Sequence, residues 1–524
     1  MTIYRSPAAD IEIPDVTLVE HVLGNALQRG DKVALVDATT GQRLTYRELA
    51  EGAAAAARGL ASRGMRPGDV VAIMSHNQPH YALAVYAVLA AGGVVTPVNP
   101  ALTTGELVKQ FVSAGAKVIV SSGQAADKAA EAAHEAGIQH HFVLGDGQMA
   151  PQGGPGAARP FSDLLVGEGP PPPLDLDPAT ALAALPFSSG TTGVSKGVML
   201  THRNLVANLE QIGVGWKVEE ADVLPAVLPF FHIYGFTIIL NAALRAGATV
   251  VTLGRYSLTS YLRMVQDFKV TRALLAPPMV LDLATAREVD DYDLSSLRLA
   301  SCGAAPLDVE VTLRAERRIG CLIRQGYGMT EASPGTHLVP DDLFDTTPAG
   351  SVGLLVPNTE ARLVDPVSGQ DAGPGEPGEL WVRGPQVMAG YLHNPAATAE
   401  TVVDDGWLRT GDIVRVDENG VFWVVDRLKE LIKYKGYQVA PAELESVLLT
   451  HPDVLDAAVV GVPHAEGGEA PKAFVVTARA LDASELMAWT AERVAPYKKV
   501  REIEFIDEIP KSPAGKILRR LLRR

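Results

Sequence analysis

The stretch Leu185-Pro-Phe-Ser-Ser-Gly-Thr-Thr-Gly-Val-Ser-Lys-Gly-Val-Met-Leu200 decides how the rest of the sequence is interpreted. The apolar run Ala181–Phe187 predicts a strand that ends in a loop rich in Ser, Thr and Gly. Glycines let backbone N–H groups face an anion, hydroxyls add donors, and a lysine adds a mobile positive charge. The stretch therefore predicts a polyphosphate-binding loop, formed by Ser188, Ser189, Gly190, Thr191, Thr192, Gly193 and Lys196.

The spacing of this loop differs from that of a Walker A motif, in which Gly, Lys and Ser or Thr are adjacent and lead directly into a helix. Here Val194 and Ser195 separate Gly193 from Lys196. An ordinary Ser/Thr/Gly surface loop is the alternative interpretation. The choice depends on whether other parts of the chain carry the residues that a nucleotide needs.

The length and composition predict a multidomain globular enzyme. A chain of 524 residues is long enough for two or more domains. Its 47% hydrophobic and 20% charged residues are typical of soluble enzymes. The net charge of −15 argues against general binding to nucleic acid or to an anionic membrane, so an anionic substrate requires a local basic site.

Cysteine usage and the absence of targeting patterns predict a cytoplasmic protein. Cys302 and Cys321 form neither a metal-ligand pattern nor a disulfide framework, which fits a reducing compartment. Residues Met1–Asp15 contain acidic residues and proline where a signal peptide has an apolar core. Glycines and a proline interrupt Tyr81–Val98, so this segment predicts a buried helix, a turn and a strand rather than stable membrane insertion.

The pattern of helices and strands predicts an α/β fold. Between residues 30 and 150 the two kinds of segment alternate, which implies parallel sheets with helices on their faces. Thr45–Gly64 predicts a helix that starts with Thr45 as N-cap and Glu48 at the capping-box position. Further expected strands are Val70–Met74, Lys117–Ser121, His141–Leu144, Val223–Phe231, Thr249–Leu253 and Ala273–Leu275.

The texture of the sequence changes twice in its last third. From Gly350 to Val425, short alternating apolar segments separated by Gly, Pro and Asp predict a small β-rich subdomain. After Asp426 a more charged, compact tail mixes helices and strands. We therefore expect a large N-terminal domain over residues 1–426, with two α/β subdomains and the β-rich one, and a small α+β C-terminal domain over residues 427–524.

Five further motifs follow the opening loop along the chain. They are Phe231-His-Ile-Tyr-Gly235, Gln325-Gly-Tyr-Gly-Met-Thr-Glu331, Thr410-Gly-Asp412, Asp426-Arg-Leu-Lys-Glu-Leu-Ile-Lys-Tyr-Lys-Gly436 and Pro513-Ala-Gly-Lys516. Together, and in this order, the six motifs resemble the adenylate-forming superfamily of acyl-CoA synthetases, aryl-CoA ligases and insect luciferases. The resemblance covers nearly the whole chain and is greatest to the 4-coumarate/cinnamate:CoA ligases.

The resemblance implies a two-step, AMP-forming ligation. A carboxylate attacks the α-phosphorus of ATP to give an acyl-adenylate and pyrophosphate, and the thiol of coenzyme A then displaces AMP to give a thioester. AMP is a stable leaving group, so the mixed anhydride is a far better acyl donor than the acid. The implied substrates are a small carboxylic acid, ATP and coenzyme A, with Mg²⁺ on the phosphate oxygens.

The resemblance also assigns nucleotide-binding roles outside the loop. Glu331 is the expected carboxylate near Mg²⁺, Thr330 an expected donor to the α-phosphate, and Tyr327 an expected flat face for adenine. Asp412 suits the ribose hydroxyls because a carboxylate can accept from both of them, with Arg427 in support. The family pattern also includes Gln325, Gly326, Lys429 and Lys433 among the residues that bind ATP or AMP. The structural alternatives are a core tyrosine for Tyr327, a helix-end acid for Glu331 and a turn aspartate for Asp412.

The last two motifs imply a mobile C-terminal domain. Lys516 is the expected catalytic lysine of the adenylating state, although on its own it reads as one more charge in the basic tail Lys511–Arg524. For the second step the resemblance assigns Lys435 and Gly436 to coenzyme A, and Lys433 and Gln438 to the thioester-forming arrangement. Lys429 occupies the hinge position, where a few residues absorb the rotation between the two steps.

The expected acyl pocket lies around His232 and Tyr234, which follow an apolar run. His232 is expected to pack against the substrate and gate it, and Tyr234 to hydrogen-bond a ring hydroxyl, although a packed core pair is the alternative. The other expected wall residues are small and leave room for a flat ring: Gly235, Cys302, Gly303, Ala304, Gly328 and Pro334. Gly235 and the segment 332–337 depart from the plant pattern, so a medium-chain fatty acid remains the alternative to a 4-coumarate/cinnamate-type acid.

Three other functions stay open at this point. They are an adenylation domain that loads a carrier protein, a luciferase-like oxidase and a nucleotide-binding relative that has lost its chemistry. Thioester formation with free coenzyme A, light emission with oxygen, and AMP release during turnover distinguish these functions. The state of assembly expected for the ligase is a monomer or a homodimer.

Overall fold

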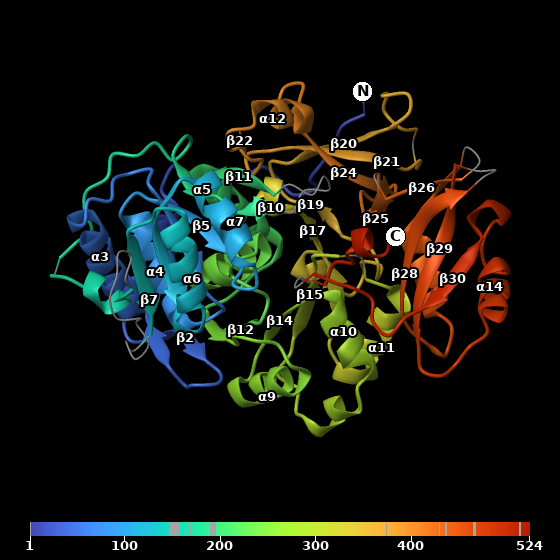
Figure 1. Cartoon of the computed structure of the whole chain (residues 1–524), viewed down its shortest axis with the longest axis horizontal. Helices are drawn as coiled ribbons and strands as arrows, with labels where there is room; N and C mark the ends of the chain where they lie inside the picture. Colours follow the sequence, from blue (N-terminus) through green and yellow to red (C-terminus); the bar gives the residue numbers. More distant parts are fainter. Residues whose placement is uncertain are drawn as a thin grey trace.

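The structure is a computed structural model of the chain. It describes residues 2–145, 158–167, 169–188, 195–305, 307–373, 375–428, 430–434, 437–464, 468–512 and 515–523, apart from the side chains of residues 433, 437 and 438. Residues 2–428 form the main body, and residues 430–523 form what we call the C-terminal lobe (Figure 1).

The first α/β layer is a largely parallel sheet that carries the ends of the Ser/Thr/Gly loop. Its strand order is β10-β11-β9-β5-β4-β6-β7-β8, with β22 paired to β11. The strands are β4 (Val70–Met74), β5 (Val94–Val98), β6 (Ala116–Ser122), β7 (His140–Leu144), β8 (Arg159–Pro160), β9 (Leu182–Ala184), β10 (Phe187–Ser188), β11 (Lys196–Thr201) and β22 (Gly390–Tyr391). The strands predicted over 70–74, 117–121 and 141–144 are confirmed.

Helices cover this sheet as the sequence predicts. They are α3 (Tyr46–Ser62), α4 (Pro79–Ala90), α5 (Thr104–Ala114) and α6 (Ala126–Glu135), with short 3₁₀ turns η1 (Gly123–Ala125) and η2 (Phe161–Leu164). Thr45 and Glu48 form the predicted capping box of α3. Every residue of α4 from Tyr81 to Ala90 is buried, so this apolar segment is a core helix. Among the described residues, no helix combines the length and apolar character needed to cross a membrane.

The second α/β layer supplies the floor of the site from two smaller sheets. Their orders are β12-β13-β2-β3 and β14-β15-β16, parallel except for β3. The strands are β2 (Val33–Asp37), β3 (Arg43–Thr45), β12 (Val223–Ala226), β13 (Thr249–Thr252), β14 (Arg272–Leu275), β15 (Leu299–Cys302) and β16 (Ile323–Gln325). The helices are α1 (Leu18–Leu23), α2 (Ala26–Arg29), α7 (His202–Gly215), α8 (Ala242–Ala246), α9 (Leu258–Phe268), α10 (Pro277–Thr285) and α11 (Val309–Ile319), with η3 (Tyr234–Asn241), a π-helix, and η4 (Arg287–Asp291).

The strand predicted over Val223–Phe231 is wrong in its second half. β12 ends at Ala226, because the buried amide of Asn77 takes over the backbone bonding beyond it. The Asn77 Nδ2 group donates to the carbonyls of Ala226 and Leu228 at 2.9 Å each, and its Oδ1 accepts from the N–H of Phe230 at 2.8 Å. The apolar run therefore continues without forming a strand, because the side chain of Asn77 makes the backbone hydrogen bonds that a neighbouring strand would otherwise make.

The β-rich part predicted between Gly350 and Val425 is confirmed, and it also recruits the N-terminus. β1 (Tyr4–Arg5) pairs with β20 (Glu360–Val364), and the sheet continues β21-β24-β23 with β25 on β24. The other strands are β17 (Tyr327–Gly328), β18 (Gly335–Leu338), β19 (Leu354–Leu355), β21 (Gly378–Arg383), β23 (Val402–Val403), β24 (Trp407–Val416) and β25 (Phe422–Arg427), beside η5 (Thr330–Ala332), η6 (Asp341–Leu343) and α12 (Pro395–Thr401).

The C-terminal lobe has its own sheet and its own core. The sheet order is β27-β26-β29-β28, with β30 on β29, and α13 and α14 pack on it. The elements are β26 (Ile432–Tyr434), β27 (Tyr437–Val439), α13 (Pro441–Leu449), β28 (Val454–His464), β29 (Gly468–Thr477), α14 (Ala483–Ala491), η7 (Pro496–Lys498), β30 (Glu502–Phe505) and η8 (Arg519–Leu521). A small apolar cluster of Ile413, Leu431 and Ala440 joins this lobe to the main body. The predicted α/β fold class, with a small α+β lobe, is confirmed.

A buried ion network holds the second α/β layer together. The Asp222 carboxylate is fully buried and accepts from Arg272 Nε at 2.9 Å and from Thr271 Oγ1 at 2.6 Å. Arg272 also pairs with Asp341 at 2.7 Å. These groups tie β12, β14 and the loop before β19 together, and removal of the arginine leaves the Asp222 carboxylate with less compensation for its burial.

We therefore expect Arg272→Ala to lower the free energy of unfolding by about 3–5 kcal/mol, measured by chemical denaturation. Arg318→Ala is the matched control, because its partner Asp290 is 68% exposed and such pairs contribute little to stability. Equal stability of the two variants would contradict the role given to the network.

Candidate functional site

The described ends of the Ser/Thr/Gly loop lie on two paired strands. Ser188, the last residue of β10, is directly opposite Lys196, the first residue of β11. The Ser195 hydroxyl donates to the Ser188 carbonyl at 3.1 Å, and this hydrogen bond joins the two described ends of the loop. The predicted phosphate-binding residues Ser189, Gly190, Thr191, Thr192 and Gly193 lie outside the described residues.

A buried carboxylate lies beside this loop. Glu331 Oε1 accepts hydrogen bonds from the Tyr391 hydroxyl at 2.8 Å and from Ser188 Oγ at 3.3 Å. The Lys196 ammonium lies 4.7 Å from the centre of the Tyr391 ring. Burial, together with Glu331, raises the pKa of Tyr391, so the hydroxyl keeps its proton and donates. Ser188 and Lys196 thus share one corner of the site with Glu331, which follows Ser188 by 143 residues.

Tyr391 is the residue of this corner that the sequence did not predict. It lies in β22, which joins β11 by the pairing of Tyr391 with Val198. This pairing of a two-residue strand across nearly two hundred residues has no periodicity or spacing that a single sequence reveals. A lone tyrosine after a glycine reads as an ordinary turn residue.

A second corner is built around Asp412. Its carboxylate accepts from the Tyr327 hydroxyl at 2.6 Å through Oδ2, and it pairs with Arg427 Nε at 3.2 Å through Oδ1. Asp412 and Arg427 are directly opposite each other on β24 and β25. Burial raises the pKa of Asp412, whereas Arg427, Tyr327 and Lys516 lower it. The corner therefore contains one buried acid with a cationic and a neutral partner.

The remaining residues of the predicted nucleotide motif follow β16. Cys302 and Gln325 are register partners at the ends of the parallel strands β15 and β16, so the segments after them meet at one edge. Gln325 Oε1 accepts from the Leu307 N–H at 3.2 Å, and Gly326 N–H donates to the Cys302 carbonyl at 3.0 Å. Thr330 opens η5 directly before Glu331. The hydrogen bonds of Gln325 and Gly326 thus connect the end of β16 to the end of β15 and the segment after it.

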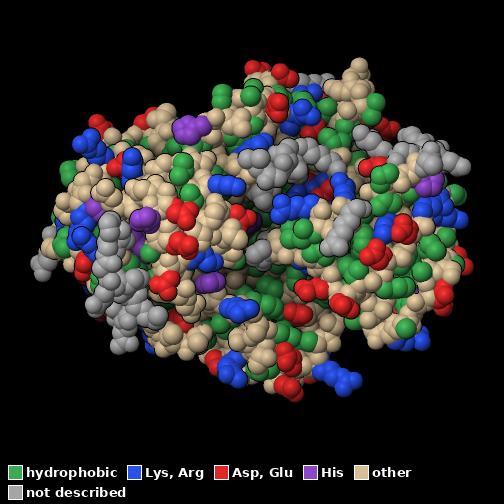
Figure 2. All heavy atoms as spheres, in the orientation of Figure 1, with side chains coloured by type: hydrophobic (Ala, Val, Ile, Leu, Met, Phe, Trp, Pro, Cys, Tyr) green, Lys and Arg blue, Asp and Glu red, His purple; other side chains and the backbone are tan. Residues whose placement is uncertain are grey.

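Lys516 reaches this site from the C-terminal lobe. It is half-buried, and its charge interacts with Arg427 and Asp412. Burial and Arg427 lower the pKa of Lys516, whereas Glu430 and Asp412 raise it. Figure 2 shows basic side chains gathered at the centre of this face, over the region where Figure 1 labels β17 and β25.

The turn that carries Lys516 rests on the main body. Ser512 and Lys516 close it through the bond from Ser512 N–H to the Lys516 carbonyl at 2.8 Å. Gly515 has φ +80°, and a Cβ added there would lie 2.6 Å from Cδ of Pro278 in α10. Only a residue without a side chain fits between the turn and this proline.

Most of the residues expected to act in the second step lie outside the described part of the structure. Lys429, Lys435 and Gly436 lie outside the described residues, as do the side chains of Lys433 and Gln438. The backbone of the last two residues is described, and it pairs them across the hairpin of β26 and β27.

The predicted acyl-pocket residues divide into two groups. Tyr234 and Gly303 face each other, since a Cβ at Gly303 would lie 3.2 Å from the tyrosine ring. His232 Nδ1 accepts from the Tyr234 N–H at 3.3 Å. Burial lowers the pKa of His232, which favours a neutral ring. Ala304 follows Gly303 with φ +74°.

Gly235 and Gly328, also predicted as pocket residues, each lie where a side chain would meet the backbone of another segment. A Cβ at Gly235 would lie 2.1 Å from the Pro229 carbonyl oxygen, and one at Gly328 would lie 2.1 Å from that of Pro334. Both contacts are with backbone, so these glycines allow close packing of neighbouring chain segments.

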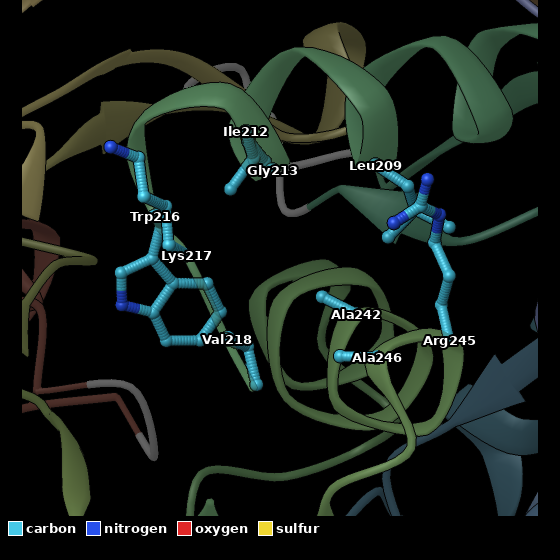
Figure 3. A pocket seen from close by; sticks show the side chains of 9 residues that line it. All are labelled: Leu209, Ile212, Gly213, Trp216, Lys217, Val218, Ala242, Arg245 and Ala246. Carbon is cyan, nitrogen blue, oxygen red and sulfur yellow. The ribbon is translucent and has the colours of Figure 1, made fainter. Parts of the chain in front are cut away.

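Two cavities lie apart from this arrangement. One, shown in Figure 3, has a volume of about 60 Å³ and lies between α7 and α8, lined by Trp216, Arg245 and their neighbours. That space holds about two water molecules and no nucleotide. The other, of about 420 Å³, lies beside Tyr4 and the turn between β24 and β25. Neither cavity is lined by a predicted site residue.

Comparison with known proteins agrees with the motifs. The sequence profile of the AMP-binding enzyme family matches residues 24–392, and that of the AMP-binding enzyme C-terminal domain matches residues 443–516. A 4-coumarate-CoA ligase 1 of Narcissus pseudonarcissus is 39% identical, over 100% of this chain and 96% of its own length. A 4-coumarate–CoA ligase-like 9 of Oryza sativa subsp. japonica is 43% identical, over 99% of this chain and 95% of its own.

Solved structures show the same architecture. An anthranilate CoA ligase, AuaEII, in complex with anthranoyl-AMP has a TM-score of 0.88 at 26% identity and covers 98% of this chain and 97% of its own. MatB of Rhodopseudomonas palustris, 29% identical over 97% of this chain and 98% of its own, has a TM-score of 0.87 in its ATP-bound form and 0.78 in its apo form. The arrangement here is therefore more similar to the ATP-bound form.

The predicted family and enzyme class are thus confirmed from sequence and structure together. ATP and coenzyme A are the co-substrates that membership implies. The chain belongs to the AMP-binding enzyme family and is an AMP-forming acid–thiol ligase of the adenylate-forming CoA ligase group.

Proposed function

We propose that this protein activates a 4-coumarate- or cinnamate-type acid with ATP and transfers the acyl group to coenzyme A, through the residues described above. The observation that carries the proposal is the convergence of Lys516 with Asp412, Tyr327 and Arg427. The Ser188–Lys196–Glu331 corner supplies the complementary phosphate end.

In the first step, an oxygen of the substrate carboxylate attacks the α-phosphorus, and pyrophosphate leaves. Asp412 accepts from the ribose hydroxyls, and Tyr327 offers its ring to adenine while its own hydroxyl holds Asp412. Lys516, with Thr330, neutralises charge at the α-phosphate as the new bond forms. Lys196 and the loop that starts at Ser188 hold the departing pyrophosphate.

Mg²⁺ fits the phosphate corner as a cation shared with the substrate. The described residues contain no cluster of three or more His, Cys, Asp or Glu side chains that could hold a metal by themselves. Mg²⁺ commonly binds one or two carboxylates together with substrate phosphates, and buried Glu331 beside the loop can provide such a carboxylate. When bound, the ion neutralises phosphate charge.

In the second step, the thiol sulfur of coenzyme A attacks the acyl carbon and AMP leaves. Residues 427–524 are proposed to rotate near Lys429 and to replace Lys516 with the face that carries Lys433 and Gln438, while Lys435 and Gly436 contact coenzyme A. The greater similarity to ATP-bound than to apo MatB supports the view that the present arrangement is the adenylating one.

The aryl preference rests on the Tyr234–Gly303 pair. A side chain at Gly303 would crowd the Tyr234 ring, since its Cβ would lie 3.2 Å from it, and the absence of one suits a flat substrate beside the ring. Relatives named as 4-coumarate–CoA ligases span the whole chain. We further propose a cytoplasmic monomer or homodimer, in keeping with free, buried Cys302 and Cys321 and with site residues that one chain supplies.

Lys516→Ala tests the division of labour between the two steps. We expect it to lower acyl-adenylate formation by at least about 100-fold, measured as pyrophosphate release, while a supplied acyl-adenylate is still converted to thioester. Lys117→Ala, an exposed lysine on β6, serves as the control. Equal loss of both steps would contradict two lobe orientations.

Gly515→Ala tests whether the close contact between the Lys516 turn and Pro278 positions the C-terminal lobe. The added methyl group meets the proline ring, so we expect adenylate formation to fall by about 10-fold or more with the thioester step preserved. Gly420→Ala is the matched control, since Gly420 has φ +77° but open space around a Cβ. If both variants lose the same activity, backbone strain explains the loss, and the contact with Pro278 does not.

A panel of acids tests the substrate class. With ATP, Mg²⁺ and coenzyme A, we expect 4-coumarate and cinnamate to give kcat/KM values at least about 10-fold above octanoate, measured as AMP and thioester. The reverse order would favour a medium-chain fatty acyl substrate. AMP release without thioester would favour a carrier protein as the acceptor.

A further inference from the structure

Three residues after Lys516, a second basic side chain of the C-terminal segment is buried. The side chain of Arg519 is 11% exposed, whereas Arg523 near the chain end is exposed. Arg519 donates to Glu445 through Nη1 at 2.6 Å and Nη2 at 3.2 Å, and to Glu430 through Nε at 2.8 Å. Its whole guanidinium fork is therefore committed to two carboxylates.

The two carboxylates belong to different parts of the C-terminal lobe. Glu445 lies in α13 and also accepts from the Val459 N–H of β28 at 2.7 Å, so it is fixed to the core of the lobe. Glu430 lies in the short connection from β25, where its N–H donates to the Arg427 carbonyl at 2.9 Å. Arg519 thus ties the segment that carries Lys516 to the lobe core and to the start of the lobe at once.

Glu430 also acts on Lys516. It raises the pKa of Lys516, so the two charges lie within range of each other. Arg519 occupies a Glu430 oxygen with a charge-assisted hydrogen bond. Without Arg519, this carboxylate loses that partner and is free to pair with Lys516 on the same segment, and such an ion pair would draw the ammonium away from the nucleotide.

We propose that Arg519 is a positioning residue for adenylate formation, which holds the Lys516 segment in place and keeps Glu430 from pairing with Lys516. The inference rests on the proposed role of Lys516. It differs from a purely structural anchor in what it predicts, because Lys516 is needed only in the first step. Loss of a structural anchor would damage the lobe and therefore both steps.

The experiment measures the two half-reactions separately in the full-length enzyme. For Arg519→Ala we expect acyl-adenylate formation to fall by about 100-fold, the scale of a small misplacement of a catalytic group, while conversion of a supplied acyl-adenylate changes less than about 3-fold. Arg519→Lys keeps the charge but loses the fork, so we expect an intermediate loss, about 10-fold, in the first step only. Arg523→Ala is the matched control and should resemble the unsubstituted enzyme.

The ratio of the two rates in Arg519→Lys decides the outcome if Arg519→Ala does not fold. A ratio equal to that of the unsubstituted enzyme, which means an equal change in both steps, overturns the proposal. Failure of the proposed function is recognised separately. In that case the unsubstituted enzyme lacks one of the half-reactions, or Lys516→Ala retains adenylate formation, whatever the Arg519 variants do.

Discussion

The site depends on one buried carboxylate that three chain segments share. Asp412 from β24 is held by Tyr327 from β17 and by Arg427 from β25, and Lys516 from the C-terminal lobe adds positive charge nearby. A carboxylate that is only 6% exposed is stable as an ion only with such partners. The pairing therefore joins the segment that follows β16, the β-rich sheet and the segment that leads to the lobe.

The connection itself is held by polar contacts rather than by a large apolar interface. Asp426 Oδ2 accepts from the Ala442 N–H at 3.3 Å, at the N-terminus of α13, where a carboxylate complements the helix dipole. Burial raises the pKa of Asp426 to about 7, whereas its backbone partners and Arg519 lower it. Among the described residues, a small apolar cluster around Leu431 lies beside these polar contacts.

The sequence predicted most of the fold because its local signals are strong. The capping box at Thr45 and the uninterrupted apolar helix after Pro79 each follow from short-range chemistry. The strand predicted beyond Ala226 does not form, because Asn77, about 150 residues earlier in the chain, hydrogen-bonds to that backbone. Tyr391 and Arg519 were missed for the same reason, since their roles arise only when distant segments meet.

The glycines show that a sequence does not reveal why a position lacks a side chain. Sequence alone does not distinguish a glycine that leaves space for a ligand from one that lets two backbones touch. Gly303 faces the Tyr234 ring, whereas Gly235 and Gly328 face carbonyl oxygens of Pro229 and Pro334. Ring-substituent preference should therefore respond to changes at Gly303, while changes at the other two act first through the backbone.

Two of the buried carboxylates in the site differ in their partners, and this difference separates their chemistry. Asp412 is paired with a cation and a neutral hydroxyl, so its negative charge is already largely compensated. The hydrogen-bond donors described for Glu331 are the hydroxyls of Ser188 and Tyr391, which orient the carboxylate without neutralising it. Because hydroxyl partners add no positive charge, a carboxylate in the second setting has oxygen lone pairs available for an incoming cation. This contrast supports placing the divalent ion beside Glu331 and the ribose beside Asp412, the assignment that the order of motifs in the chain first suggested.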